Sequence, residues 1–183
     1  MARIKGVVFV NRYDYLMSTA GEAGLAKVMA KLSADDAKAL NLPNASEWYP
    51  LETVLRVDQV ILDEVLGGNL ERMIEVGAFS WRQNLNVTYR FLFRILSTET
   101  ILSQASGAFR KMLDTGTASV EKLAPRDVIV RYEGFHPVKE SYCRVLKGSL
   151  VGIMDACRVK GTVTDHACVF KGDPCCAFRA RWE

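Results

Sequence analysis

The chain has 183 residues, of which 49% are hydrophobic and 25% charged, a composition typical of a globular protein. Its net charge is only +3, and Lys and Arg alternate with Asp and Glu, which argues against a nucleic-acid groove or a polybasic membrane surface. No apolar run is long enough to span a bilayer and no signal peptide is evident, so we expect a cytoplasmic protein whose cysteines stay reduced.

Residues 1–116 predict a mainly helical part that follows a short strand at 6–10. Apolar residues recur at helical spacing, and capping signals mark the ends: Ser33 precedes two acidic residues, Pro50 stands in a first turn, and Gly67 follows a last turn. Helices are therefore expected at residues 11–32, after Ser33, from Pro50 to Gly67, at 70–96 with an interruption near Gly77, and at 101–113.

Residues 117–183 predict a sheet-containing part. Short segments rich in β-branched residues predict strands at 117–123, 127–133, 158–168 and 175–182. Between the two strand pairs, residues 139–157 carry a clean apolar helical stripe, with Gly148 and Gly152 on a neighbouring face where close packing is expected. The fold class is therefore α+β: an N-terminal helical layer followed by a β-β-α-β-β antiparallel sheet unit, in a single domain spanning 1–183.

The cysteines gather at the C-terminal end, because all five lie at or after Cys143. Strand alternation and a hairpin turning near Gly172 bring Cys168 and Cys176 to one face and point Cys175 to the other. Cys143, in the first turn of the preceding helix, can lean over the same face as the first two. Three thiols can thus converge from a helix and a hairpin.

Two interpretations of this convergence are open. Zinc held by three thiolates needs a fourth ligand, and strand alternation favours His166, whereas Asp165 requires a bulge. Buried free cysteine also behaves as a small hydrophobe, so a packed thiol cluster is the alternative. Cys157 and Cys175 are expected to be structural in either case.

The spacing of these residues resembles a known domain. The matching positions are Cys143, Gly148, Gly152, Asp165, Cys168, Gly172, Cys176 and Phe178. They resemble the 4-vinyl reductase domain, which belongs to the superfamily of haem nitric-oxide-binding domains and TRAPP vesicle-tethering subunits. Over the whole chain, Lys5–Phe9, Trp48–Glu52 and the terminal cysteine segment look like a myxobacterial paralogous family of unknown function.

The resemblance implies a ligand site and a metal site. Relatives enclose a small apolar or aromatic molecule, or an acyl chain, between the helical layer and the sheet, where Trp81, Tyr89 and Phe93 are the pocket candidates here. In phenol-sensing relatives three cysteines and a glutamate hold zinc, and these ligands fall on Cys143, Asp165, Cys168 and Cys176. Asp165 is one methylene shorter than glutamate, and the gap from Cys143 to Cys168 is one residue shorter.

Haem is not expected on the sequence evidence. The chain has two histidines, His136 and His166, and neither lies in the long helices where the nitric-oxide-binding relatives carry their haem ligand. A structural zinc is the cofactor that the resemblance suggests, and the packed thiol cluster without metal stays open as its alternative.

Three functions are compatible with these observations. The first is a non-enzymatic sensory or regulatory domain that binds a small molecule in an apolar pocket. The second is an adaptor with a self-filled pocket, which acts through a homodimer and a protein partner. The third, an enzyme acting on tetrapyrroles or another pigment, is suggested only by the name of the domain. Neither nucleic-acid binding nor membrane insertion is expected.

Overall fold

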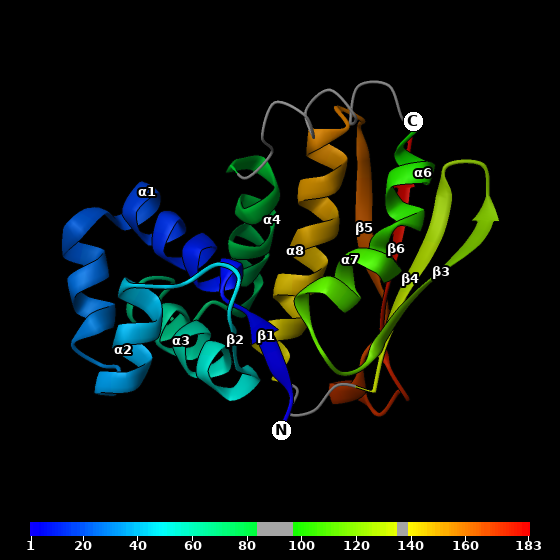
Figure 1. The fold of residues 1–183 in the computed structure, drawn as a ribbon. Helices are drawn as coiled ribbons and strands as arrows, with labels where there is room; N and C mark the ends of the chain where they lie inside the picture. Colours follow the sequence, from blue (N-terminus) through cyan, green and yellow to red (C-terminus); the bar gives the residue numbers. More distant parts are fainter. Residues whose placement is uncertain (84–96, 135–138) are drawn as a thin grey trace.

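The computed structural model describes residues 1–83, 97–134 and 139–183, which form helices on one side and a four-stranded antiparallel sheet on the other (Figure 1). The first elements are β1 (Arg3–Lys5), α1 (Val7–Met29), α2 (Ala34–Asn41), β2 (Trp48–Pro50), α3 (Leu51–Glu64), the 3-10 turn η1 (Leu70–Arg72) and α4 (Met73–Gln83). They are followed by α6 (Thr98–Ser103), α7 (Ala105–Met112), β3 (Thr117–Ala124), β4 (Asp127–Glu133), α8 (Glu140–Ala156), β5 (Gly161–Ala167), the 3-10 turn η2 (Val169–Lys171) and β6 (Cys176–Trp182). The expected α+β class, with its β-β-α-β-β unit, is confirmed.

Three boundaries differ from the sequence-based prediction. The strand expected at 6–10 is wrong, because Val8 and Phe9 bury their side chains from the first turns of α1 and the strand is β1, which pairs with β2. The helix expected at 101–113 is divided at Gln104 into α6 and α7. Gly77 does not interrupt α4, and the expected helical residues 84–96 lie outside the described ranges.

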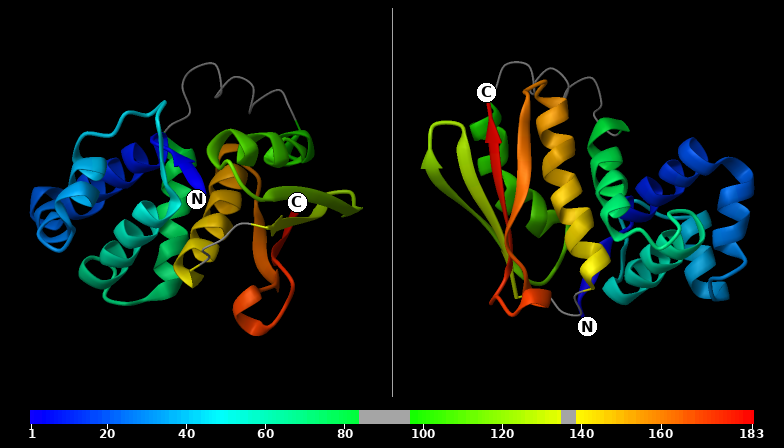
Figure 2. Two further views of the ribbon diagram at one scale, coloured as in Figure 1. Left: turned by 60° about the horizontal axis from the view of Figure 1, so that its bottom comes forward. Right: turned by 180° about the vertical axis from the view of Figure 1, so that it is seen from behind.

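The four-stranded sheet has the order β3-β4-β6-β5 and is antiparallel throughout. Its inner face is apolar, and Val130 of β4 stands opposite Phe178 of β6. Figure 2 shows α8 lying along this sheet, with α4 on the side of α8 that faces α1. Phe109 of α7 contacts Tyr132 of β4 with ring centroids 5.4 Å apart, so α7 covers the same face.

The contact between α4 and α8 is made through glycines. A Cβ on Gly77 would lie 2.1 Å from the carbonyl oxygen of Val145, and a Cβ on Gly148 would lie 2.1 Å from that of Ile74. Gly152 meets α4 in the same way, 2.6 Å from the carbonyl oxygen of Ala78. The expected close packing at Gly148 and Gly152 is therefore confirmed, and it explains why Gly77 belongs inside a helix.

Gly148→Ala is expected to destabilise the protein by about 1–3 kcal/mol, because the added methyl group meets backbone that cannot move alone. Gly107→Ala in α7 is the matched control: nothing lies within 4 Å of its Cβ position, so the gain in helix propensity should raise stability by up to about 1 kcal/mol. Urea unfolding of both variants measures the difference. Equal stabilities would contradict the glycine contact.

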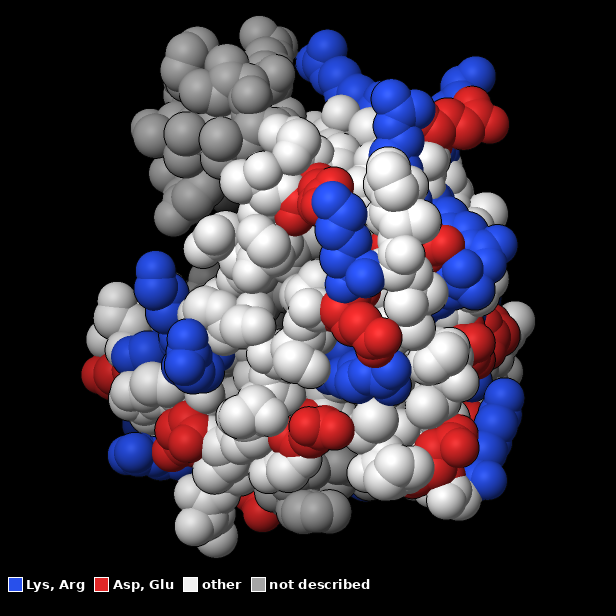
Figure 3. Space-filling model, turned by 90° about the vertical axis from the view of Figure 1, so that its right-hand side faces the viewer, with Lys and Arg blue, Asp and Glu red and all other residues white. Residues whose placement is uncertain are grey.

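The outer face of the sheet carries ion pairs. Asp127 bonds Arg179 and Arg181, and Glu121 bonds Arg131, so charged residues of both signs stand among uncharged ones on this side of the molecule (Figure 3). Beneath them Ile129, Cys175 and Ala177 form a small second core, which confirms that Cys175 points away from the other thiols of the hairpin. Across the described residues, no helix combines the length and apolarity needed to cross a bilayer.

Asp36 links α2 to α3 by a two-pronged ion pair. Its carboxylate oxygens each lie 2.7 Å from a guanidinium nitrogen of Arg56, while Ser33 caps α2 by accepting the Asp36 N–H. The Arg56 hydrogen bonds lower the pKa of Asp36, against the opposing effect of its burial.

Asp36→Asn is expected to lose about 1 kcal/mol at neutral pH, a modest value because Arg56 is half-exposed. A folded-state pKa below the unfolded value means that this stabilisation is present above about pH 4 and is lost as the pH falls through the folded-state pKa. Urea unfolding of both proteins across this range measures the effect. A difference that persists at the lowest pH would contradict the ion pair as its cause.

Candidate functional site

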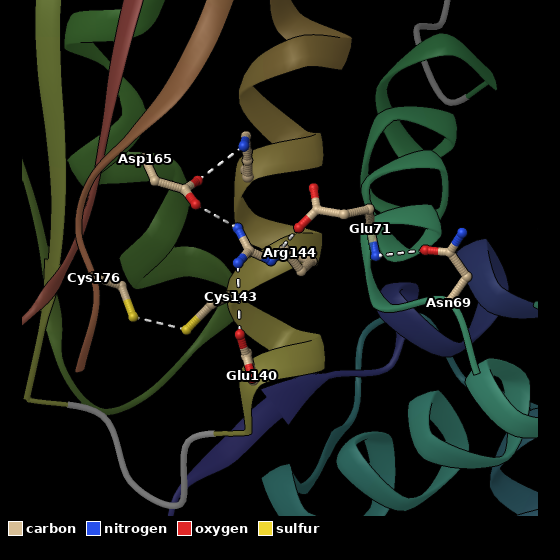
Figure 4. A network of polar contacts seen from close by, with 8 residues as sticks. Asn69, Glu71, Glu140, Cys143, Arg144, Asp165 and Cys176 are labelled. Carbon is tan, nitrogen blue, oxygen red and sulfur yellow. Dashed lines mark hydrogen bonds and ion pairs between the residues drawn. The ribbon is translucent and has the colours of Figure 1, made fainter. Parts of the chain in front are cut away.

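The expected approach of Cys143 to Cys176 is confirmed, at the point where α8 and β6 begin (Figure 4). Their Sγ atoms lie 2.7 Å apart, and the two residues are 2% and 1% exposed. Cys168, buried directly after β5, helps to lower the pKa of Cys176. Sulfur atoms therefore form a contact between α8 and the sheet, and this contact is almost completely shielded from water.

The two sulfurs of the pair differ in acidity. The hydrogen bond from Cys143 lowers the pKa of Cys176 to about 6, against its burial, and the Val169 N–H, Cys168 and the charge of Arg144 lower it further. The same hydrogen bond, followed by burial, raises the pKa of the Cys143 thiol far above its usual range. Of the two sulfurs, Cys176 is therefore the one whose surroundings favour the thiolate.

Arg144, the residue after Cys143, lies at the centre of an ion-pair network (Figure 4). Its guanidinium contacts Asp165 of β5 at 2.7 Å, Glu71 of η1 at 3.1 Å and Glu140 of α8 at 3.5 Å. Lys147 also bonds Asp165, at 2.8 Å. Arg144 thus connects three elements that are distant in the sequence, although it is only 7% exposed.

The zinc expectation is not supported by this geometry and is corrected. Two thiolates on one tetrahedral zinc, each about 2.3 Å from the metal, would be about 3.8 Å apart, whereas Cys143 and Cys176 are at 2.7 Å. Asp165 is occupied by Arg144 and Lys147, and His166 is exposed on β5. Among the described residues, no group of three His, Cys, Asp or Glu side chains could hold a metal ion.

A register shift explains where Asp165 and His166 point. The pairing of β5 with β6 is regular up to Asp165 opposite Phe178 and resumes at Ala167 opposite Ala177, so the irregularity falls at His166. The bulge required to turn Asp165 towards the helix side is therefore present, but its partners are cations. The sequence analysis did not identify Arg144 as a site residue. The one feature that could have indicated it is a positive charge beside the apolar stripe of α8.

The apolar pocket candidates lie only partly within the described residues. Trp81, near the end of α4, packs against the main core, while Tyr89 and Phe93 fall outside the described ranges. A separate hollow of about 390 Å³ opens at the surface beside α2 and α3. It is lined by Lys31, Leu32, Ser33, Asp36, Arg56, Gln59, Val60 and Lys139, none of which was a pocket candidate.

Three aromatic side chains contact one another between α7 and the sheet. Phe109, Tyr132 and Phe178 form a continuous ring series, with centroids 5.4 and 6.1 Å apart. Haem iron commonly takes an axial histidine. Of the two histidines, His166 is exposed and His136 lies outside the described ranges, so the described residues place no histidine in the interior.

Comparison with known proteins shows similarity in structure alone. No family model matches the chain, and no curated protein is significantly similar in sequence. An H-NOX protein from S. oneidensis in the Fe(II)NO ligation state has a TM-score of 0.76 at 12% identity, covering 98% of this chain and 99% of that one. An oxygen-binding H-NOX domain related to soluble guanylate cyclases has a TM-score of 0.73 at 14% identity, covering 98% and 95%.

These similarities correct the prediction about haem. The sequence analysis expected none, yet the similar structures include H-NOX proteins in Fe(II) states and others concerned with heme distortion and heme redox potential. Excluding haem was therefore wrong, because the structures that share this fold include haem proteins. Within the described residues, however, no histidine lies in the interior to ligate haem. The part of the superfamily expectation that names the haem-NO-binding fold is confirmed: the chain has the fold of the H-NOX domains.

Proposed function

We propose that this chain is a non-enzymatic, cytoplasmic sensory or regulatory domain that binds an apolar small molecule. The observation that supports it is the likeness to ligand-binding H-NOX proteins over 98% of the chain. We also propose the finer relationship to the 4-vinyl reductase domain and to the myxobacterial family. The spacing of the cysteines and glycines supports it. No step of the proposed function is a covalent reaction.

The ligand would bind beside α4, where Trp81 packs against the core next to the α8 contact. A Cβ on Gly152 would lie 2.9 Å from the Cβ of Trp81, so Trp81 stands where α4 meets α8. An aromatic wall of this kind binds apolar molecules through a large contact area with little loss of side-chain freedom. Tyr89 and Phe93 complete the proposed wall.

The test is native mass spectrometry of the full chain as purified, together with titration of haemin and of an apolar phenol. We expect a bound small molecule or saturable uptake of one probe. Trp81→Ala should weaken binding about tenfold or more, the usual effect of removing a central aromatic contact. Trp48→Ala is the matched control, because Trp48 lies on β2 and is 37% exposed, and it should bind as the wild type does. A chain that purifies empty and takes up neither probe would overturn the proposal.

The adaptor function is the second candidate, favoured by the aromatic side chains that contact one another between α7 and the sheet. On this interpretation the chain would act as a homodimer through its N-terminal helices and bind a protein partner. Light scattering at high protein concentration is expected to give twice the monomer mass. A monomer that carries a ligand would count against the adaptor and in favour of the sensor.

A further inference from the structure

The thiol pair links two elements that are far apart in the sequence. Cys143 belongs to α8 and Cys176 to β6, and 33 positions separate them. Their sulfurs are 2.7 Å apart, whereas the sulfurs of a disulfide are separated by about 2.05 Å. A covalent bond would thus require the two atoms to approach by less than about 1 Å. The remaining three cysteines are free as well, so the pair is not committed to another disulfide.

We propose that Cys143 and Cys176 form a reversible disulfide when hydrogen peroxide oxidises the protein. The sulfur of Cys176 attacks the peroxide oxygen, the O–O bond breaks, and the departing oxygen leaves as water after taking up a proton. Cys143 then attacks the resulting sulfenic acid, the S–O bond breaks, and a second water leaves as the S–S bond forms. Two thiols lose two electrons and two protons, and one hydrogen peroxide becomes two waters.

The surroundings of Cys176 suit it for the first step. The sulfur of Cys143 lies 2.7 Å from that of Cys176, and the guanidinium of Arg144, the residue after Cys143, lies in the same region (Figure 4). These groups favour negative charge on sulfur, and the thiolate is the form that attacks an oxidant. Cys143 is already in contact, so it can resolve the sulfenic acid without a large movement.

A small oxidant has a short route to the pair. Cys176 follows η2 closely in the sequence, and Phe170 and Lys171 of that turn are exposed, so we expect access from solvent to open at η2. Hydrogen peroxide is close to water in size, and local opening of a surface turn is among the least demanding of native-state motions. Larger oxidants such as glutathione disulfide should react much more slowly.

The disulfide would tie the start of α8 to β6 beside the Arg144 network. It would therefore lock the helix that carries Arg144 to the sheet, a regulatory step that needs no bound ligand. The inference goes beyond the proposed function and does not rest on it. Ligand uptake and the state of the thiols are read by different measurements, so either can fail while the other holds.

The test is peptide mapping of the reduced full chain after treatment with hydrogen peroxide. Trypsin separates the relevant cysteines: Cys143 lies in the peptide 140–144, Cys168 in 161–171, and Cys175 with Cys176 in 172–179. We expect 140–144 linked to 172–179, with release of both peptides by a dithiol. The oxidised chain should also melt on the order of 5–10 °C higher, as expected for a cross-link closing a loop of this size.

Variants identify the sulfurs. Cys175→Ser and Cys157→Ser should form the linked peptide as the wild type does, whereas Cys176→Ser and Cys143→Ser should not. Fragmentation of the linked wild-type peptide between Cys175 and Cys176 assigns the bond even where a variant fails to fold. Thiols that stay reduced, a link from 161–171 to 172–179 in its place, or irreversible oxidation of Cys176 alone would each overturn the proposal.

Discussion

Replacing Leu150 by Asp is expected to abolish soluble expression. Leu150 lies near the middle of α8, is 1% exposed and belongs to the main core. The substitution removes a buried apolar side chain and places a carboxylate where none of its oxygens finds a partner. The loss should exceed about 5 kcal/mol, a large part of the stability of a typical domain. The soluble fraction after expression measures it, with the melting temperature of any protein recovered.

Leu42→Asp is the matched control, since Leu42 follows α2 and is 74% exposed. The same change of side chain in contact with water should alter stability by less than about 0.5 kcal/mol. A Leu150→Asp variant as soluble and as stable as Leu42→Asp would show that α8 does not pack as described.

Asp58→Ala is the second substitution with a large expected effect. Asp58 of α3 receives two hydrogen bonds from Arg12 of α1, at 2.7 and 3.0 Å, and the side chains are 0% and 3% exposed. Removing the carboxylate leaves a guanidinium charge buried without its partner, which typically destabilises by about 3–5 kcal/mol. Urea unfolding of the variant should show this as a lower midpoint with a similar slope.

The double variant Arg12→Met with Asp58→Leu separates the charge from the packing. If the loss in Asp58→Ala arises from an unpaired charge, removing both charges should restore most of the stability, because apolar replacements of a buried pair are often neutral. A double variant less stable than Asp58→Ala would show that the pair itself contributes net stability. In either case α1 and α3 are held together by the contact.

The sequence predicted the elements well where periodicity was strong. The stripe from Tyr142 to Cys157 gave α8 almost to its ends, and Ser33 caps α2 as expected. Short apolar runs were less informative, because four residues cannot distinguish a strand from the first turn of a helix, and Val7–Val10 is helical. The sequence also could not tell whether Gly77 breaks a helix or permits a contact, since that depends on Val145 of another element.

The sequence predicted the approach of the cysteines in the candidate site, but not the ion pairs beside them. Strand alternation placed Cys176 on the face that Cys143 can reach from the first turn of its helix, and the structure has the two sulfurs in contact. The partners of Asp165 depend on the bulge at His166 and on the height of Arg144 along α8, neither of which a local pattern determines. Asp58 is a second example. The sequence shows a carboxylate at an apolar position of α3, but it does not show that the partner is Arg12, 46 positions away.

The glycine contact between α4 and α8 has a consequence for how the molecule moves. Side chains between two helices can change rotamer and let the helices slide, but Gly77 and Gly148 leave backbone against backbone. No side chain separates the helices at those points, so α4 and α8 are expected to move together. A displacement that starts at the end of α4 beside Trp81 should then reach the start of α8, where Arg144 pairs with Asp165 of β5.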